Sequence, residues 1–167
     1  QLSKRDLQGV TILRSERNQG PAAARNKGLQ AAREAGIKYV CFTDADCLPK
    51  PNWLQSMVQH FEEHPDDDLL GGITQSLDGS TYVDLFHDIF GTLNGRLLPD
   101  KTLLYAPTCN MGIRMRSVTG SFSMAFPEAA FEDIDFCIKA RKSGAILRHV
   151  EARVLHDYDS SIGGLFK

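Results

Sequence analysis

Long apolar runs are missing from this sequence, in which the longest, such as Tyr39 to Phe42, are only a few residues long. A helix that crosses a bilayer needs about 20 consecutive apolar residues. No segment of the sequence is therefore expected to span a membrane. Internal repeats, low-complexity segments and linker-like stretches rich in Pro, Gly or Ser are also missing, which favours a single domain.

Cysteine pairs and an excess of charge are missing as well. The four cysteines, Cys41, Cys47, Cys109 and Cys137, show neither a C-x-x-C pattern nor zinc-ligand spacing with histidine. We expect reduced cysteines that pack inside a cytoplasmic protein. With 19 basic against 21 acidic residues, the net charge is -2. Because composition forces no basic face on the molecule, nucleic acid is disfavoured as a partner.

The residues that are present have an ordinary globular composition, with 42% hydrophobic and 24% charged. A length of 167 residues is close to one domain of roughly 150 residues and suffices to bury one core. We therefore expect residues 1–167 to form a single α/β domain. The sequence opens at Gln1 without a methionine, so we expect the chain to be a piece of something larger.

Helical spacing of apolar residues and short β-prone runs alternate along the chain. Helices are expected at 22–35, from Asn52 to 61, at 80–94 and at 132–143, and strands at 7–13, 38–43, 69–74, 110–118, 145–148 and 152–156. The run at 38–43 is continuously apolar and follows a helix, so it predicts a buried parallel strand in a βαβ unit. Gly28, inside the first helix, is expected to permit close packing of that helix on the sheet.

Two carboxylates, Asp44 and Asp46, follow the expected strand at 38–43. Ligands of open α/β folds bind at the carboxyl ends of strands, and carboxylate oxygens suit Mg²⁺ or Mn²⁺. This D-x-D pattern predicts a site for a metal ion and a phosphate; the alternative is that it only caps a turn. A phosphatase of the haloacid dehalogenase type would also place a nucleophilic Asp here, but Leu48 stands where that family needs Thr or Val.

Three further segments could carry chemistry. The turn from Asn18 through Gly20 leads into a helix whose free amides can receive an anion, with Arg25 adding a charge-assisted contact; the alternative is a capped surface helix with a solvated arginine. Glu132 and Asp133 open another helix, where acids stabilise the helix dipole or supply a general base. His156 ends a strand and is either structural or a metal ligand.

In their order along the chain, these segments resemble the GT-A glycosyltransferases, in particular family 2 of inverting enzymes. The matching pieces are N-x-G-x-x-x-A-R-N-x-G from Asn18, D-x-D from Asp44, a strand from Asn110 to Arg116, E-D-x-D from Glu132 and a late histidine. The resemblance implies a Rossmann-like α/β fold with a mixed, mainly parallel sheet flanked by helices. It also implies a missing N-terminal strand-helix-strand segment, which in the family binds the nucleotide.

The resemblance assigns roles to these residues. Asp133 would be the catalytic base, with Glu132 beside it, and Asp46 and His156 would hold a divalent cation, Mn²⁺ or Mg²⁺. Asp44 would lie near the ribose or donor sugar. Residues assigned to the donor are Asp44, Asp46, Arg25, Asn18 and Gly20, and those assigned weakly to the acceptor side are Asn110, Arg114 and Arg116. Arg114 and Arg116 could reach the diphosphate or the acceptor; the alternative is that they are solvated strand residues.

The implied activity is metal-dependent, inverting transfer of a sugar from a nucleotide-diphosphate sugar to a hydroxyl of a polysaccharide, lipid-linked or other glycan acceptor. The alternative is a non-catalytic GT-A-like fragment that acts as a binding or scaffolding module, because the N-terminal unit is missing. Many members of the family act at the inner face of the plasma membrane. The apolar stripe from Val83 to Leu93 could make such a peripheral contact, and bulk cytoplasm is the default location.

Overall fold

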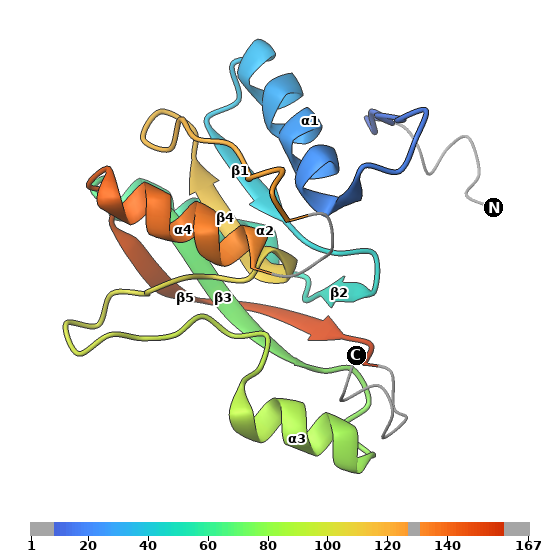
Figure 1. Cartoon of the computed structure of the whole chain (residues 1–167). Coiled ribbons are helices and arrows are strands. Elements are labelled where there is room, and N and C mark those ends of the chain that lie inside the picture. Colours follow the sequence, from blue (N-terminus) through green and yellow to red (C-terminus); the bar gives the residue numbers. More distant parts are fainter. Residues whose placement is uncertain (1–8, 127–130, 159–167) are drawn as a thin grey trace.

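The chain folds around one curled sheet, with helices on both of its faces (Figure 1). The computed structural model describes residues 9–126 and 131–158. The helices are α1 (Gly20–Glu34), α2 (Trp53–Glu63), α3 (Tyr82–Phe90) and α4 (Glu132–Lys142), and the strands are β1 (Tyr39–Phe42), β2 (Cys47–Pro49), β3 (Leu69–Ser76), β4 (Met111–Arg114) and β5 (Leu147–His156), with a 3-10 turn η1 (Thr108–Asn110) before β4. The expected α/β class is confirmed, and every expected helix is found within a few residues of its predicted bounds.

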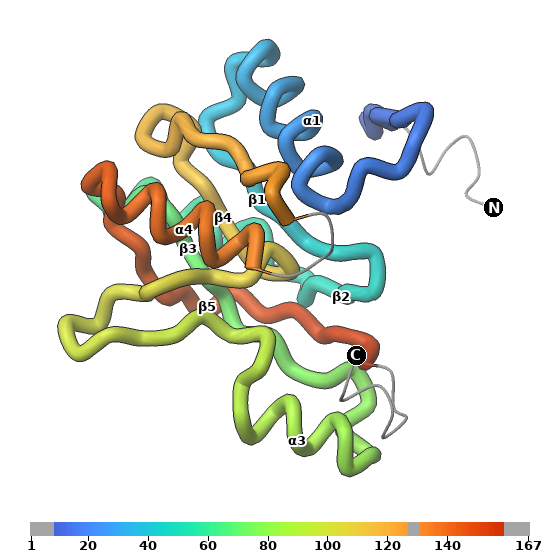
Figure 2. Tube along the Cα trace, in the orientation of Figure 1, coloured from blue at the N-terminus to red at the C-terminus, as the bar shows by residue number. Residues whose placement is uncertain are grey.

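The sheet has the strand order β1-β4-β3-β5-β2. Only β3 and β5 run parallel, and the β1–β4, β3–β4 and β2–β5 pairs are antiparallel. Figure 2 shows β3 and β5 side by side through the centre of the fold. The sheet is mixed as expected, but the prediction that it is mainly parallel is wrong for the described strands.

Strand β1 explains this error. Its side chains alternate between two apolar clusters: Val40 and Phe42 pack on one, and Tyr39 and Cys41 pack on the other. The continuous apolar run therefore reflects two covered faces, and it carries no information on strand direction. Because β1 pairs antiparallel with β4 at the end of the described sheet and is only half-buried, the predicted buried parallel strand and βαβ unit are not formed.

Two clusters of buried side chains lie on opposite faces of the sheet. Neighbouring residues of β3 show the division, because Leu69 belongs to one cluster and Leu70 to the other. The first cluster includes Leu29 of α1 and Phe136 of α4. The second includes Phe61 of α2. Helices α1 and α4 thus cover one face and α2 the other, which leaves the ends of the strands to carry the site.

The strand expected at residues 7–13 is not found in the described part of this range. Residues 7–8 lie outside the described residues, and residues 9–13 form no strand. Val10, Ile12 and Leu13 of this stretch are exposed, because no neighbouring strand in the described part of the chain pairs with them. The expectation that Gly28 permits close packing of α1 on the sheet is also wrong. A Cβ built on Gly28 meets nothing within 4 Å among the described residues, so the packing of α1 does not require glycine there.

Membrane-crossing segments were also not expected. Among the described residues, none of the helices combines the length and the apolar composition that crossing a bilayer demands.

Candidate functional site

A cavity of about 250 Å³ lies where the end of β1, helix α1, turn η1 and the start of α4 meet. Its charged lining comes from three places along the chain: Arg25, Asp44 and the pair Glu132–Asp133, with Thr92 and Thr108 adding hydroxyl groups. The remaining walls are mostly apolar and include Leu93, Tyr105, Pro107 and Phe131. The fold therefore brings three of the predicted site segments to one place.

Arg25 is the cation of this cavity. Its Nη1 donates to Oε1 of Glu132, and its Nη2 lies 3.4 Å from Oδ1 of Asp44. Its guanidinium also lies 5.8 Å from the centre of the Phe122 ring. The arginine is therefore an ion-pairing residue that joins α1 to both acidic segments, and the alternative of a solvated surface arginine is wrong.

Glu132 is almost fully buried, with 3% of its surface exposed. One carboxylate oxygen is paired with Arg25, and the other, Oε2, has no hydrogen-bond partner among the described residues. A buried carboxylate with a free oxygen is costly unless a donor reaches it. The ion pair with Arg25 is therefore the contact that compensates the buried charge of Glu132 in the described structure.

Asp133 follows Glu132 and lines the cavity. Its carboxylate accepts hydrogen bonds from the backbone N–H of Ile134, at 2.7 Å, and of Thr108, at 3.4 Å. Burial raises the pKa of Asp133 above its ordinary value, and the negative charge of Glu132 raises that pKa further, against the opposing effect of Arg25 and the two amides. A carboxylate with a raised pKa is a better proton acceptor than a fully solvated one.

A second group of polar side chains surrounds the pairing of β2 with β5. Cys47 lies directly opposite His156 in this antiparallel pair, and Nε2 of His156 is 3.6 Å from Oδ1 of Asp46. Three residues, Asp46, Cys47 and His156, each offer one ligand atom, and these atoms all lie within 4.8 Å of one another. A carboxylate, an imidazole and a thiol are all metal-binding groups, so these residues fit a divalent cation.

Cys47 was missed as a candidate from the sequence. The only local signal was its position directly after the D-x-D pattern, and its pairing with His156 comes from the fold. A hydrogen bond from the Cys109 thiol lowers the pKa of Cys47, and the same contact together with burial raises the pKa of Cys109. Because Cys109 also lines the cavity, this thiol pair connects the metal-binding group to the cavity.

The two acids of the D-x-D pattern therefore face different neighbours. Asp44 lines the cavity with Asp133, whereas Asp46 lies in the group with His156. The backbone turn between them is closed by the N–H of Cys47, which donates to the carbonyl of Asp44 at 3.2 Å. This turn places the two groups next to each other.

Asn18 and Gly20 lie at the start of α1 and do not line the cavity. The side-chain oxygen of exposed Asn18 accepts a hydrogen bond from the N–H of Gly20 at 2.9 Å. Gly20 has a φ of 83°, a left-handed conformation that favours glycine. In the described structure these two residues shape the entry into the helix, and they do not contact Asp44 or Asp133.

Asn110 and Arg114, assigned to the acceptor side, are internal structural residues. Asn110 donates to the carbonyls of Ile73 and Ala152 and accepts from the Trp53 indole at 2.8 Å. Only 1% of Asn110 is exposed. All its hydrogen-bonding groups are engaged in joining β3, β5 and α2, so it is not free to contact an acceptor.

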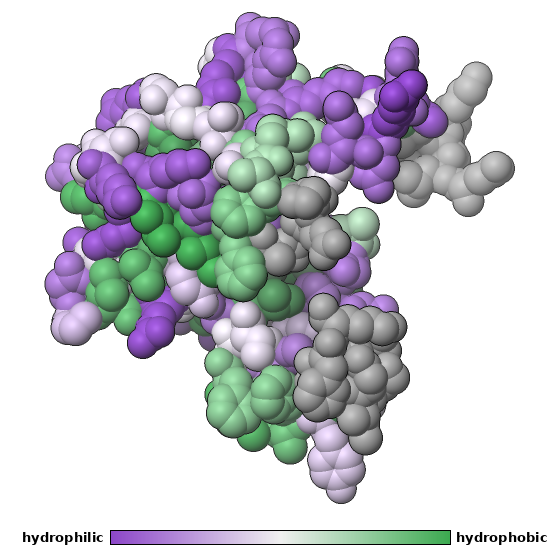
Figure 3. Space-filling view, in the orientation of Figure 1, coloured by the Kyte–Doolittle hydropathy of each residue, from purple (hydrophilic) through white to green (hydrophobic). Residues whose placement is uncertain are grey.

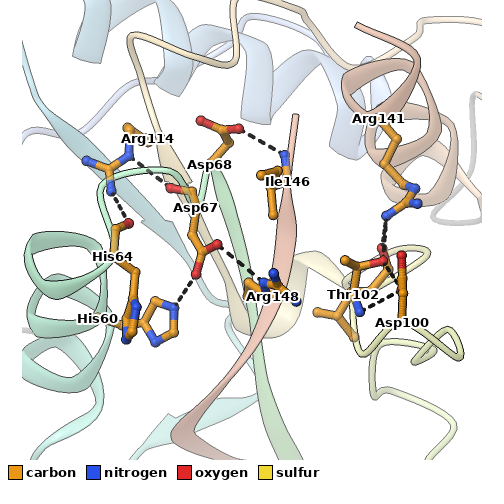
Figure 4. Close-up of polar contacts among 11 residues, drawn as sticks. His60, His64, Asp67, Asp68, Asp100, Thr102, Arg114, Arg141, Ile146 and Arg148 are labelled. Atoms are coloured by element: carbon orange, nitrogen blue, oxygen red, sulfur yellow. Dashed lines mark hydrogen bonds and ion pairs between the residues drawn. The ribbon is translucent and has the colours of Figure 1, made fainter. Parts of the chain in front are cut away.

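Arg114 caps the C-terminal end of α2 (Figure 4). It donates to the carbonyls of Phe61, His64 and Asp67, and it is 2% exposed. The last carbonyls of a helix lack partners within the helix, and the guanidinium supplies them. Arg116 is exposed and donates to the carbonyl of Pro65. Neither arginine lines the cavity. The buried hydrogen bonds of Arg114 contradict a contact with a diphosphate or an acceptor, and the exposure of Arg116 favours the alternative of a solvated residue.

Comparison with known proteins points to one family. The profile described as "Glycosyl transferase family 2" matches residues 1–119. The "Pre-mycofactocin glycosyltransferase" of Mycobacterium tuberculosis, in two strains, is 28% identical over 161 residues, which are 92% of this chain and 33% of the relative. An "Uncharacterized glycosyltransferase" of Methanocaldococcus jannaschii is 36% identical over 61 residues, covering 36% of this chain and 20% of the relative. The chain thus spans about a third of the length of its mycobacterial relatives.

Proposed function

The chain belongs to glycosyltransferase family 2, and on that premise we propose that it transfers a sugar from a nucleotide-diphosphate sugar to a hydroxyl of an acceptor. The transfer is a single displacement with inversion at the anomeric carbon. The observation that carries this proposal is the cavity in which Asp133, with its raised pKa, lies together with Asp44 and Arg25.

Asp133 is the base of the proposed reaction. As the acceptor oxygen attacks the anomeric carbon, its proton passes to the Asp133 carboxylate. The amides of Ile134 and Thr108 hold this carboxylate in position. Because the base acts directly on the acceptor hydroxyl, the reaction requires neither a cysteine nucleophile nor a covalent glycosyl-enzyme.

Arg25 and Asp44 form the donor side of the cavity. Their ion pair fixes the Asp44 carboxylate at the end of β1, where it can accept hydrogen bonds from ribose or sugar hydroxyls. Glu132 lies beside the base and holds the other end of the guanidinium. It is a positioning residue in this scheme, because it is buried behind Arg25.

Asp46 and His156 are the proposed ligands of a divalent cation, Mn²⁺ or Mg²⁺, which members of this family often use. Such a cation neutralises the charge that develops on the diphosphate leaving group. The support for this assignment is the 3.6 Å approach of the His156 Nε2 to the Asp46 carboxylate. The Asp46 side chain, in the turn before β2, is 55% exposed, so a diphosphate can approach the group from the side of Asp46.

The acceptor class proposed here is a glycan, a polysaccharide or a lipid-linked molecule that offers a free hydroxyl. The name of the mycobacterial relative adds pre-mycofactocin as one acceptor to include in a test panel. That name describes the relative, whose identity to this chain is 28%.

A peripheral membrane contact is part of the same proposal, at the inner face of the plasma membrane. Helix α3 exposes the large apolar side chains of Tyr82, Leu85, Ile89 and Phe90. Figure 3 shows this helix as an apolar region at one end of the molecule. Co-sedimentation with vesicles is expected to fall when Ile89 and Phe90 are replaced by serine, and equal co-sedimentation of the variant would remove the membrane contact from the proposal.

Replacement of Asp133 by asparagine tests the catalytic assignment. The variant is expected to bind the donor as the wild type does and to lose about 10²- to 10⁴-fold in kcat. NMR of the product is expected to show an inverted anomeric configuration for the wild type. Asp135→Asn, on the same helix, is the matched control and is expected to retain activity.

Transfer that survives in Asp133→Asn would remove this residue as the base. Donor binding without transfer to any acceptor, in both wild type and control, would favour the alternative of a binding or scaffolding module.

A further inference from the structure

The group formed by Asp46, Cys47 and His156 contains a thiol that the proposed function does not use. We propose that Cys47 is a direct ligand of the cation at this position, so that the site takes a softer divalent ion such as Zn²⁺ or Co²⁺ in preference to Mg²⁺. This inference rests on the proposed function only for the presence of a cation between Asp46 and His156. It adds a third protein ligand and a different class of metal.

The backbone fixes the relation between the thiol and the imidazole. Cys47 and His156 are directly opposite residues of the antiparallel β2–β5 pair, and opposite residues project their side chains to the same face of a sheet. The N–H of Asp157 donates to the carbonyl of Asp46 at 2.9 Å, so the hydrogen bonding between the two segments continues past the cysteine. The three candidate ligands are therefore held by main-chain pairing and do not depend on a mobile loop.

The ligand atoms of Asp46, Cys47 and His156 all lie within 4.8 Å of one another, close enough for one ion to contact all three. Around zinc, with bonds of about 2.0–2.3 Å, neighbouring oxygen and nitrogen ligands lie about 3.4 Å apart and neighbouring oxygen and sulfur ligands about 3.6 Å apart. In the structure, Oδ1 of Asp46 lies 3.6 Å from Nε2 of His156 and 3.8 Å from Sγ of Cys47.

The imidazole of His156 is held in place by packing. Its Nε2 lies 3.6 Å from Oδ1 of Asp46. The ring is packed against Tyr158, with 4.5 Å between the ring centres, and Tyr158 stacks in turn on His87 at 3.9 Å. Aromatic packing therefore holds the ring with Nε2 toward the carboxylate and the thiol.

The chemistry of the donor set decides which ion is preferred. Thiolates favour zinc and other soft or borderline ions, whereas Mg²⁺ is bound almost entirely through oxygen. Three protein ligands also leave one tetrahedral position open, as in zinc sites that bind a substrate. In this chain the open position would accept an oxygen of the donor diphosphate.

Cobalt absorption spectroscopy tests this directly, because Co²⁺ bound to a thiolate shows a near-ultraviolet charge-transfer band that Co²⁺ bound only to oxygen and nitrogen lacks. Titration of the wild-type chain with Co²⁺ is expected to produce this band, and addition of Zn²⁺ is expected to remove it. Cys47→Ser is expected to lose the band and to bind Zn²⁺ at least about tenfold more weakly, since even outer-shell changes cost about 10- to 100-fold in affinity. Cys41→Ser, in β1 at the other end of the strand order, is the matched control and should keep the band.

A second measurement needs no variant. Alkylation of Cys47 by iodoacetamide, followed by mass spectrometry of the wild type, is expected to slow when Zn²⁺ is added and to stay unchanged with Mg²⁺. Cobalt binding without the charge-transfer band, a band that persists in Cys47→Ser, or alkylation that Zn²⁺ does not slow would each overturn the thiolate ligand while leaving the proposed function intact. If the wild type binds none of Co²⁺, Zn²⁺, Mn²⁺ or Mg²⁺, the cation itself is wrong, and the metal-dependent part of the proposed function falls with it.

Discussion

Arg25 and Glu132 form a buried ion pair that joins helix α1 to the first residue of helix α4, across 107 positions of sequence. The side chains are 14% and 4% exposed, respectively. The same guanidinium contacts Asp44 after β1. One arginine thus holds together the segments that carry the proposed donor-binding and base residues.

Replacing Arg25 by methionine is expected to lower the free energy of unfolding by about 3–5 kcal/mol, because a buried carboxylate is left without its counter-charge. Urea unfolding measures the change. The double variant Arg25→Met/Glu132→Leu is expected to recover most of the loss, since it buries no unpaired charge. Arg116→Met, at an exposed position, serves as the control and should change stability little. A double variant that is as unstable as the single one would contradict the ion-pair explanation.

Asp133 gives a prediction on pH. Burial raises its pKa in the native state above the value of 3.8 expected for an unfolded chain. Between these two pKa values the native state binds more protons than the unfolded state, so the free energy of unfolding falls as pH rises through that window. At neutral pH the wild type bears the full cost of the buried charge.

Asp133→Asn removes this cost. The variant is expected to be at least as stable as the wild type at pH 7 and to lose less stability as pH rises from about 4. Thermal unfolding measured over a pH series checks the difference. Asp135→Asn loses only a 2.6 Å surface pair with Lys139 and should follow the wild-type profile. If Asp133→Asn also follows it, the raised pKa is not a property of this residue.

Gly72 in β3 and Gly28 in α1 give opposite predictions for replacement by alanine. A Cβ on Gly72 would lie 2.3 Å from the carbonyl oxygen of Ala152 and 2.4 Å from the side chain of Asn110. Gly72→Ala is therefore expected to destabilise the fold severely, by more than about 3 kcal/mol. Gly28→Ala, which meets nothing within 4 Å, is expected to stabilise it by about 0.5–1 kcal/mol through helix propensity. Equal effects at the two positions would show that the β3–Asn110 packing is wrong.

Much of this arrangement could be predicted from local pattern. The helical spacing in 53–61 and the glycine after Ser143 gave helices that the structure confirms. The D-x-D acids do follow a strand, and Glu132 does begin a helix. These features depend on residues within one or two turns of each other, which is why the sequence alone indicates them.

Contacts between distant segments could not be predicted. The β-prone run at 110–118 predicted β4, although the strand found is shorter. Nothing in that run indicated that the Arg114 guanidinium turns inward to the carbonyls at the end of α2. The pairing of Cys47 with His156 depends on a three-residue strand containing Pro49, which has no recognisable strand pattern. Strand direction likewise has no signal in a run whose side chains pack on both faces.

The buried Arg114 and the exposed Arg116 are expected to differ in their contribution to stability. Arg114→Ala leaves the carbonyls of Phe61 and His64 without their donor, so it is expected to cost about 3 kcal/mol or more. Arg116→Ala is expected to cost under about 0.5 kcal/mol. Neither change is expected to alter the affinity for a nucleotide sugar. Weaker nucleotide binding by a folded Arg116→Ala would restore this residue to the site.

The most direct test of the central claim is calorimetric titration of a panel of nucleotide-diphosphate sugars, with and without a divalent cation, against the chain and its Asp46→Ala variant. The account predicts binding of at least one donor that requires the cation and that falls about tenfold or more in Asp46→Ala, with Asp66→Ala as an exposed acidic control that binds like the wild type. Donor binding that is independent of the cation and unchanged in Asp46→Ala, or no donor binding under any condition, would contradict it.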